Sequence, residues 1–240
     1  MSTEGRPSCA QSVATLYAAL EAGATLIDTA DSYHIGADEV GHNELLIQRA
    51  LAQSSFARSE LVIATKGGHI RPGDGTWRID GSPDYIAAAA RASLSRLKVD
   101  AIDLYYLHRP DPKVPLAESV GALVTLHDEG LIKAAGVSNV NDEEIRLAHS
   151  ILGDRLIAVQ NKLSLVHQGT TSGVALCNSL GLSFVARSPL GSKSGVLSLD
   201  RIPGVRQIAR SHCVSTQRVA LAWALAAGSN VIPVFGTTQP

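Results

Sequence analysis

The chain has 240 residues, of which 45% are hydrophobic, so it can bury one sizeable core, and α/β barrels often occupy this length undivided. Its 21 basic and 22 acidic residues nearly cancel, which excludes the bulk electrostatic field that attracts nucleic acid or anionic membranes. The three cysteines, Cys9, Cys177 and Cys213, are widely spaced and form no CxxC pair, so the sequence suggests neither a disulfide framework nor a zinc site.

Helical and strand-like patterns alternate from one end of the chain to the other. In chain order they predict helix 12–23, strand 25–29, helix 43–53, strand 61–65, a helix from Pro83, strand 101–107, helix 116–129, strand 134–137, helix 142–152, strand 156–160, helix 171–180, strand 182–186, helices 205–212 and 216–227, and strand 231–235. The clearest helix start is Ser82-Pro83-Asp84, with a capping hydroxyl, a proline in the first turn and a carboxylate at the positive end of the helix dipole.

Repeated strand–helix units with continuously apolar strands indicate a parallel sheet covered on both faces. No linker or composition break interrupts the pattern, so we predict a single domain over residues 1–240. Periodicity alone leaves open whether the sheet closes into a barrel or stays open and doubly wound. No GxGxxG motif follows the first predicted strand, which disfavours the dinucleotide-binding form of the open sheet.

Four polar residues at the ends of these strands form a set suited to carbonyl chemistry. Asp28 ends the first strand with Tyr33 in the turn beyond, Lys66 follows the second, and His108 follows the third. Parallel strands share one carboxyl edge, so we expect the four side chains to gather there. Taken singly, each has a plainer reading, as a turn cap, a packed aromatic residue, a solvated strand end or a surface histidine.

Together the four groups cover what reduction of a carbonyl requires. An ordinary tyrosine has a pKa near 10 and is a poor acid at neutral pH, but a neighbouring ammonium lowers the pKa of a phenol. A carboxylate paired with the ammonium keeps it charged, and an imidazole donates a hydrogen bond to the substrate oxygen. The sequence therefore predicts a proton-transfer site.

Several segments resemble the aldo-keto reductases and occur in the order found in that family. They are LIDTADSY (26–33), GHNE (41–44), ATKGG (64–68) and DLYYLHRPD (103–111). The resemblance implies a (β/α)8 TIM-type barrel. It also implies Tyr33 as general acid, Lys66 as the group that tunes its pKa, Asp28 as the partner of Lys66, and His108 as the residue that orients the carbonyl.

The resemblance further implies a nicotinamide cofactor, with NADPH favoured over NADH because the family usually prefers it. Ser138, Asn139 and Gln160 correspond to residues that hold the carboxamide, and Arg187 stands where many relatives stack an aromatic ring under the nicotinamide. The loop that covers the pyrophosphate corresponds to Ser188, Leu190, Gly191 and Ser192, a segment that could equally be an ordinary turn. Thr237 lies at the threshold of the helix that grips the adenosine 2′-phosphate in relatives.

At both ends the sequence departs from the family pattern. Residues 1–10 are too few and too polar to supply the first barrel strand, and the sequence stops before the cofactor-binding helix. We therefore expect an incomplete barrel without its first strand and last helix.

The first functional hypothesis is NADPH-dependent reduction of an aldehyde or ketone to the alcohol by hydride transfer. The alternative is a catalytically idle or truncated relative that serves as a nucleotide-binding or interaction protein; another enzyme on an α/β barrel explains none of the motif order. We expect no metal, no nucleic-acid or membrane partner, and a small carbonyl substrate, for which the loop 69–81 with Trp77 is one candidate wall. No apolar leader or run of membrane length is found, so a cytoplasmic location is expected.

Overall fold

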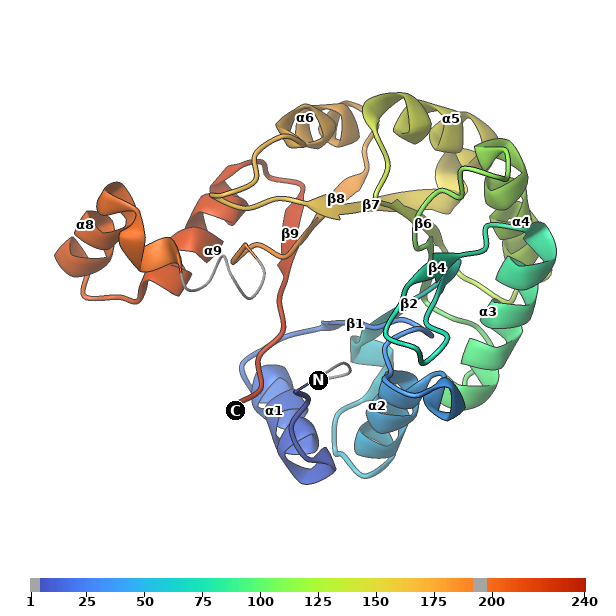
Figure 1. Cartoon of the computed structure of the whole chain (residues 1–240), viewed down its shortest axis with the longest axis horizontal. Coiled ribbons are helices and arrows are strands. Elements are labelled where there is room, and N and C mark those ends of the chain that lie inside the picture. The colour runs from blue at the N-terminus through green and yellow to red at the C-terminus, as the bar shows by residue number, and fades with distance from the viewer. Residues whose placement is uncertain (1–4, 192–197) are drawn as a thin grey trace. The chain divides into compact units, whose positions relative to one another are not determined.

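The computed structural model describes residues 5–191 and 198–240 (Figure 1). These residues divide into two units. Unit 1 extends to Ser138 and also contains Leu147–Leu156 and Gly236–Pro240, and unit 2 contains Asn139–Arg146 and Ile157–Phe235. This division does not test the prediction of a single domain, which stays a prediction.

The strands of unit 1 are parallel and neighbour one another in chain order. They are β1 (Leu26–Asp28), β2 (Val62–Gly67), β5 (Leu104–Leu107) and β6 (Ala135–Ser138). In the register Asp28 lies beside Ala64 and Lys66 beside Tyr106, so successive strands end close together. Every residue of β5 and β6 is buried, and both strands are apolar up to Ser138 at the end of β6, as expected for parallel strands covered on both faces.

Helices α1 (Cys9–Glu21), α2 (His42–Ala52), α3 (Pro83–Leu97) and α4 (Leu116–Asp128) follow one another around the strands of unit 1 (Figure 1). The Ser8 hydroxyl accepts a hydrogen bond from the amide of Gln11 at the start of α1, and the Ser82 hydroxyl accepts one from the amide of Tyr85 at the start of α3, which confirms the start predicted for α3. The core between α1, α2 and the strands is built from Leu16, Leu20, Ile27, Ile47, Ala50, Leu61, Ile63 and Leu97.

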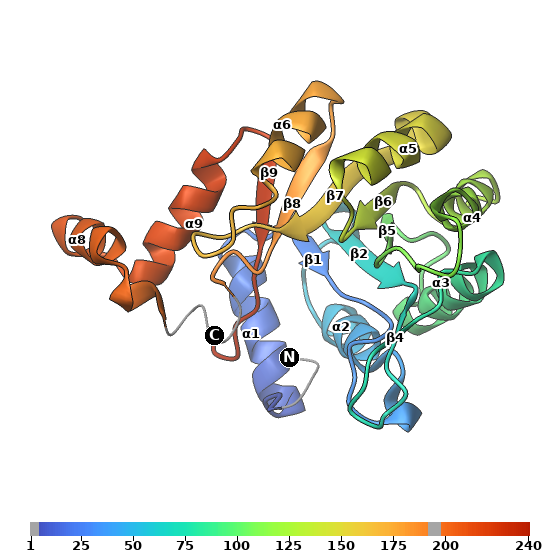
Figure 2. The same ribbon diagram turned by 45° about the horizontal axis from the view of Figure 1, so that its top comes forward.

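A small antiparallel hairpin that the sequence did not predict follows β2 directly (Figure 2). Its strands are β3 (His69–Ile70) and β4 (Arg78–Ile79), with His69 paired to Ile79. Two residues per strand are too few to produce a recognisable alternation of apolar and polar residues.

The strand β5 is shorter than the predicted 101–107, and Asp103 explains why. Its Oδ2 accepts from the Ile63 amide at 2.9 Å and from the guanidinium of Arg58 at 2.5 Å, while Lys133 Nζ donates to its Oδ1 at 2.8 Å. Because a carboxylate takes the place of a backbone acceptor here, the regular ladder begins only at Leu104.

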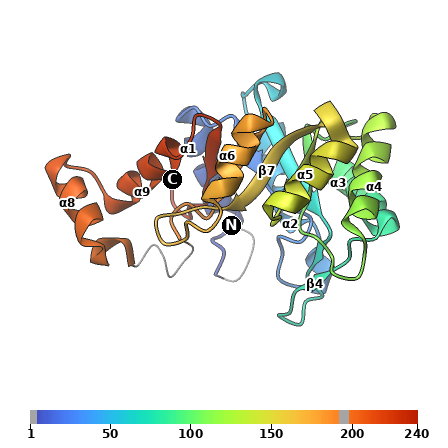
Figure 3. The ribbon, with the colours of Figure 1, turned by 90° about the horizontal axis from the view of Figure 1, so that it is seen from above.

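In unit 2, β7 (Leu156–Lys162, which enters this unit at Ile157), β8 (Ser183–Arg187) and β9 (Val231–Val234) are also parallel and adjacent in chain order. Its helices are α6 (Thr171–Ser179), α8 (Pro203–Ser211) and α9 (Thr216–Ala226), and α8 lies beside α9 (Figure 3). Helix α5 (Asp142–Leu152) starts with a reciprocal cap in which Asn141 Oδ1 accepts from the Glu144 amide at 2.9 Å and Glu144 Oε2 from the Asn141 amide at 2.7 Å. The predicted alternation of strands and helices is confirmed over these residues.

Short 3₁₀ turns connect several elements. They are η1 (Ala37–Glu39), η2 (Arg58–Glu60), η3 (Gly153–Arg155) and η4 (Leu199–Arg201). Within residues 5–191 and 198–240, no helix has the length and apolar character needed to cross a membrane.

Candidate active site

Lys66 is the centre of the predicted site, and its side chain has no exposure to solvent. Its Nζ donates to Asp28 Oδ2 at 2.6 Å and to the Thr29 carbonyl oxygen at 2.7 Å. The same nitrogen lies 3.4 Å from Tyr33 Oη and 5.0 Å from the centre of the Tyr33 ring. Three of the four predicted catalytic residues therefore form one hydrogen-bonded group.

His108 completes the predicted set. Its ring meets that of Tyr33 edge to face, with 5.9 Å between the ring centres, and meets His69 in the same way at 5.0 Å. Trp77 stacks on His69, with 4.6 Å between the ring centres, and the guanidinium carbon of Arg71 lies 5.0 Å from the centre of the Trp77 ring. The structure thus brings the four predicted residues together and adds the hairpin β3–β4 to their surroundings.

Main-chain hydrogen bonds at the carboxyl ends of β1 and β2 hold these side chains in place. The Thr29 amide donates to the Ala64 carbonyl at 2.8 Å, and the His108 amide donates to the Gly67 carbonyl at 2.8 Å. The sheet therefore sets the positions at which Asp28, Lys66 and His108 leave the main chain, as expected for side chains that share one edge of a parallel sheet.

The buried ammonium of Lys66 remains protonated at neutral pH. Burial by itself lowers the pKa of Lys66, but the carboxylate of Asp28 and the phenol of Tyr33 outweigh burial, and the pKa lies above its ordinary value. A charge in this position is available to stabilise negative charge on its neighbours.

Unit 1 also contains a buried pair of carboxyl groups, Asp31 and Glu44, which the sequence analysis did not single out. Asp31 and Glu44 are both buried, and Glu44 accepts hydrogen bonds from Thr65 Oγ1 at 2.6 Å and Arg96 Nε at 2.5 Å. Asp31 has a weaker partner, the Tyr85 hydroxyl at 3.4 Å. Burial, and next the charge of Glu44, raise the pKa of the Asp31 carboxyl to about 7. The signal available in the sequence was a second carboxylate, Asp31, between Asp28 and Tyr33.

Asp31→Asn is expected to remove a pH-dependent loss of stability. Because the folded pKa is raised from 3.8, the proton on Asp31 stabilises the fold fully below about pH 4, and this contribution disappears as the pH rises through about 7. The upper limit of the loss is about 4 kcal/mol. Urea unfolding of wild type and variant between pH 4 and pH 8 measures the difference.

Asp38→Asn, which removes an exposed carboxylate from the same segment, is the control for this measurement. If the difference in unfolding free energy between Asp31→Asn and wild type stays constant over the whole range, the raised pKa of Asp31 is wrong.

The predicted cofactor residues at the next strand ends are more buried than ordinary loop residues. Ser138, at the end of β6 in unit 1, and Gln160, on β7 in unit 2, are both fully buried. Asn139 has a left-handed backbone with a φ of 58°, and its main-chain amide donates to the main-chain carbonyl of Gln160 at 3.2 Å. Arg187 ends β8, and its Nη2 donates to Asn139 Oδ1 at 2.8 Å.

The segment after Arg187 forms a turn. Ser188 has a φ of 53° and Gly191 a φ of 82°, and the Gly191 amide donates to the Ser188 carbonyl at 2.8 Å, with Leu190 between them. The predicted contact Ser192 lies outside the described residues. Thr237 belongs to unit 1, where it is exposed and its hydroxyl donates to the Gln239 carbonyl at 3.0 Å.

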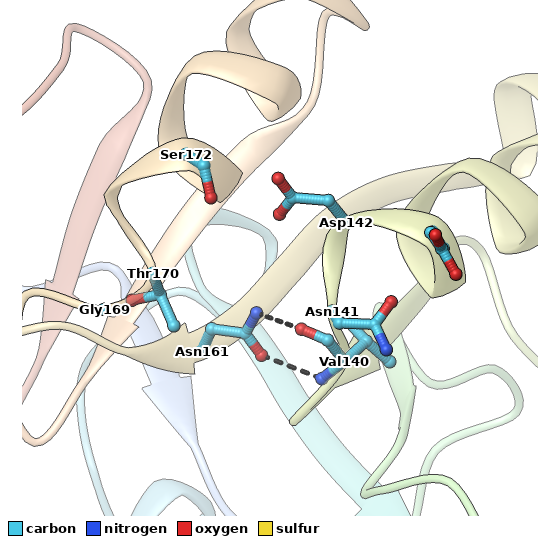
Figure 4. Close-up of a pocket in the computed structure, with 8 residues that line it drawn as sticks. Val140, Asn141, Asp142, Asn161, Gly169, Thr170 and Ser172 are labelled. Atoms are coloured by element: carbon cyan, nitrogen blue, oxygen red, sulfur yellow. Dashed lines mark hydrogen bonds between the residues drawn. The ribbon is translucent and has the colours of Figure 1, made fainter.

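Unit 2 also contains an open pocket of about 470 Å³ (Figure 4). It is lined by Val140, Asn141, Asp142, Glu143, Asn161, Gly169, Thr170 and Ser172. Asn161 closes part of its wall, because its side chain accepts from the Val140 amide at 3.1 Å and donates to the Val140 carbonyl at 2.7 Å. None of the predicted site residues that the structure describes is among these lining residues. Among the described residues we also find no group of three or more histidine, cysteine or carboxylate side chains placed to hold a metal ion.

Comparisons with known proteins identify the family. The sequence profile of the Aldo/keto reductase family matches residues 1–240. A probable aldo-keto reductase of Glycine max is 36% identical over 92% of this chain and 69% of that protein, and an uncharacterized oxidoreductase of Schizosaccharomyces pombe is 34% identical over 95% and 70%.

Solved structures agree with this assignment. The glycerol dehydrogenase of Gluconobacter oxydans superimposes with a TM-score of 0.84 and 27% identity, over 98% of this chain and 79% of that chain. An aldo/keto reductase from Klebsiella pneumoniae, with a TM-score of 0.80 and 24% identity, matches 98% of this chain and 78% of its own and is evidence for the fold alone. The expected fold class, an incomplete (β/α)8 barrel, is thereby confirmed. The chain belongs to the aldo/keto reductase family and is an oxidoreductase of that family.

Proposed function

We propose that this protein reduces an aldehyde or ketone to the alcohol with NADPH as cofactor and Tyr33 as general acid. The observation that carries the proposal is the approach of the fully buried Lys66 Nζ to Tyr33 Oη, at 3.4 Å, while the same nitrogen is bound to Asp28. A lysine with a structural role alone would be satisfied by the carboxylate of Asp28 and the carbonyl of Thr29, without a phenol beside its charge.

Tyr33 gives its proton to the substrate oxygen as negative charge develops there. The ammonium of Lys66 stabilises the negative charge that the Tyr33 oxygen acquires in this step, since a close opposite charge is worth most where water is excluded. Asp28 and the Thr29 carbonyl keep Lys66 charged and fixed, so little reorganisation accompanies the transfer.

His108 lies against Tyr33 and suits the task of orienting the carbonyl. The two rings meet edge to face with 5.9 Å between their centres, so the imidazole lies next to the phenol that we propose as the acid. An imidazole N–H that donates to the substrate oxygen fixes its distance from Tyr33 Oη and polarises the carbonyl. His69 lies against His108 and Trp77 stacks on His69, so we propose that these two side chains contact the rest of the substrate.

A nicotinamide cofactor fits the polar groups of the later strand ends. Asn139 and Gln160 carry amide side chains, which both donate and accept as a carboxamide requires, and Ser138 adds a hydroxyl. In the turn 188–191, Ser188 offers a hydroxyl, and Gly191, with its left-handed φ and no side chain, allows close approach of an anionic group. The bound nicotinamide supplies the hydride. NADPH is proposed over NADH on the usual preference of the family.

The direct test of this function combines binding and turnover. Titration with NADPH, followed by the change in its fluorescence, is expected to saturate, and addition of 4-nitrobenzaldehyde is expected to consume NADPH with equimolar formation of the alcohol. A chain that binds NADPH but reduces no aldehyde or ketone in a broad panel would be a nucleotide-binding relative. A chain that binds neither NADPH nor NADH would contradict the proposal altogether.

Gln160→Ala is expected to weaken NADPH binding by roughly 1–3 kcal/mol, the cost of leaving a buried polar partner unsatisfied. The substitution removes the side-chain amide of Gln160, which is fully buried and proposed to bind the carboxamide, and it retains the hydrogen bond from the Asn139 main-chain amide to the Gln160 main-chain carbonyl. Fluorescence titration measures the dissociation constant. Gln168→Ala makes the same chemical change at an exposed position and is the matched control. An unchanged dissociation constant for Gln160→Ala would mean that this residue only completes the strand.

A further inference from the structure

The contact between Arg187 and Asn139 joins two residues of unit 2 that are 48 positions apart in the sequence. Arg187 is the last residue of β8, and its Nη2 donates to Asn139 Oδ1 at 2.8 Å. The expectation from the family pattern was a stacking group at position 187. In the structure its guanidinium is hydrogen-bonded to the side-chain amide of Asn139.

This contact determines which way the Asn139 amide faces. A guanidinium carries only donors, so the atom of Asn139 that meets it has to be the oxygen. The amide nitrogen, Nδ2, then lies on the opposite branch of the side chain, and it can act only as a donor. An asparagine without this contact is free to rotate its amide and offer either an acceptor or a donor.

The backbone of Asn139 is held as firmly as its side chain. Its φ of 58° lies in the left-handed region, which asparagine adopts more readily than most residues other than glycine. The main-chain amide of Asn139 donates to the main-chain carbonyl of the buried Gln160 at 3.2 Å. The main chain and the amide plane are therefore both set before any ligand arrives.

We propose that Arg187 is a positioning residue that makes Asn139 a dedicated hydrogen-bond donor to the carboxamide oxygen of the nicotinamide. The inference rests on the proposed function, because it assigns a direction to one of the contacts proposed for the cofactor. It differs from a stacking role, which needs the guanidinium plane against the ring, and from a purely electrostatic role, which needs only its positive charge.

The experiment compares two ligands that differ in one atom. NADP⁺ carries a carboxamide oxygen, and its thionicotinamide analogue carries a sulfur there, which is a much weaker acceptor. Isothermal titration calorimetry of the wild-type chain with each ligand gives the ratio of the two dissociation constants. We expect NADP⁺ to be preferred by roughly 2- to 12-fold, the range of one hydrogen bond.

Two variants test this preference, one at the proposed donor and one at the residue proposed to orient it. Asn139→Asp retains an acceptor for Arg187 but loses the donor, so the preference for oxygen over sulfur is expected to fall to about 1, whatever the change in overall affinity. Arg187→Met removes the contact that fixes the amide, and we expect the ratio to fall at least twofold. Arg206→Met removes an exposed arginine of α8 and is the matched control, with the wild-type ratio retained.

The ratio separates the possible outcomes because effects on the rest of the cofactor cancel in it. If Arg187→Met weakens both ligands equally and keeps the wild-type ratio, Arg187 acts by charge or stacking and the inference is wrong. If wild type binds both ligands equally, or Asn139→Asp keeps the preference, Asn139 is not the donor. If wild type binds neither ligand, the proposed function and this inference both fail.

Discussion

Tyr33→Phe is expected to lower the rate of carbonyl reduction by ~10²–10⁴-fold while leaving NADPH affinity nearly unchanged. The variant removes only the hydroxyl that Lys66 Nζ approaches at 3.4 Å, and the phenyl ring keeps its contact with His108. Steady-state rates with 4-nitrobenzaldehyde, beside a fluorescence titration with NADPH, measure the two quantities separately.

The matched control is Tyr17→Phe. It removes a hydroxyl of the same unit whose partner is the Ala50 carbonyl, at 2.8 Å, outside the predicted site. We expect this variant to retain the wild-type rate. A Tyr33→Phe rate within about twofold of wild type, against the expected loss, would show that another group delivers the proton.

Asp28→Ala is expected to lower the free energy of unfolding by about 3–5 kcal/mol, the usual cost of leaving a buried charge without its partner. Lys66 is fully buried and bound to Asp28 at 2.6 Å, so the variant leaves an ammonium that the Thr29 carbonyl and the Tyr33 hydroxyl only partly compensate. Urea or thermal unfolding at neutral pH measures the loss.

The double variant Asp28→Ala/Lys66→Met tests the cause. Methionine has nearly the length of lysine and no charge, so a buried pair replaced in this way is expected to recover most of the lost stability. Both variants are expected to be inactive, which separates stability from catalysis. If the double variant is as unstable as the single one, the destabilisation comes from packing around Asp28 rather than from the uncompensated charge.

Local features of the sequence were sufficient for much of the architecture. Strands buried on both faces give continuous apolar runs, as in β5 and β6, and helices such as α3 carry their own start signals, so the order of strands and helices could be predicted with small errors at their ends. The strand 101–107 was the clearest error, since the ion pairs and amide contact of Asp103 delay the start of the ladder to Leu104. Those partners lie 30 to 45 residues away and leave no local trace.

The candidate site was predictable in part. Asp28, Tyr33, Lys66 and His108 were found because each follows a predicted strand and because their motifs occur in the family's order. The hairpin β3–β4 and the stack of His69 on Trp77 were not found, because the pairing of two-residue strands depends on contacts rather than on periodicity.

By itself, the sequence determined the class of the fold, the family and the identity of the four groups proposed for proton transfer, because motif order and apolar periodicity are local properties. The tertiary structure alone decided the environment of individual side chains. Burial of Asp31 beside Glu44 raises its pKa to about 7, and Arg187 meets Asn139 although strands and helices separate them in the chain. Burial, charge pairing and the direction of an amide are set by neighbours that the fold brings together, and no linear pattern records which neighbours those will be.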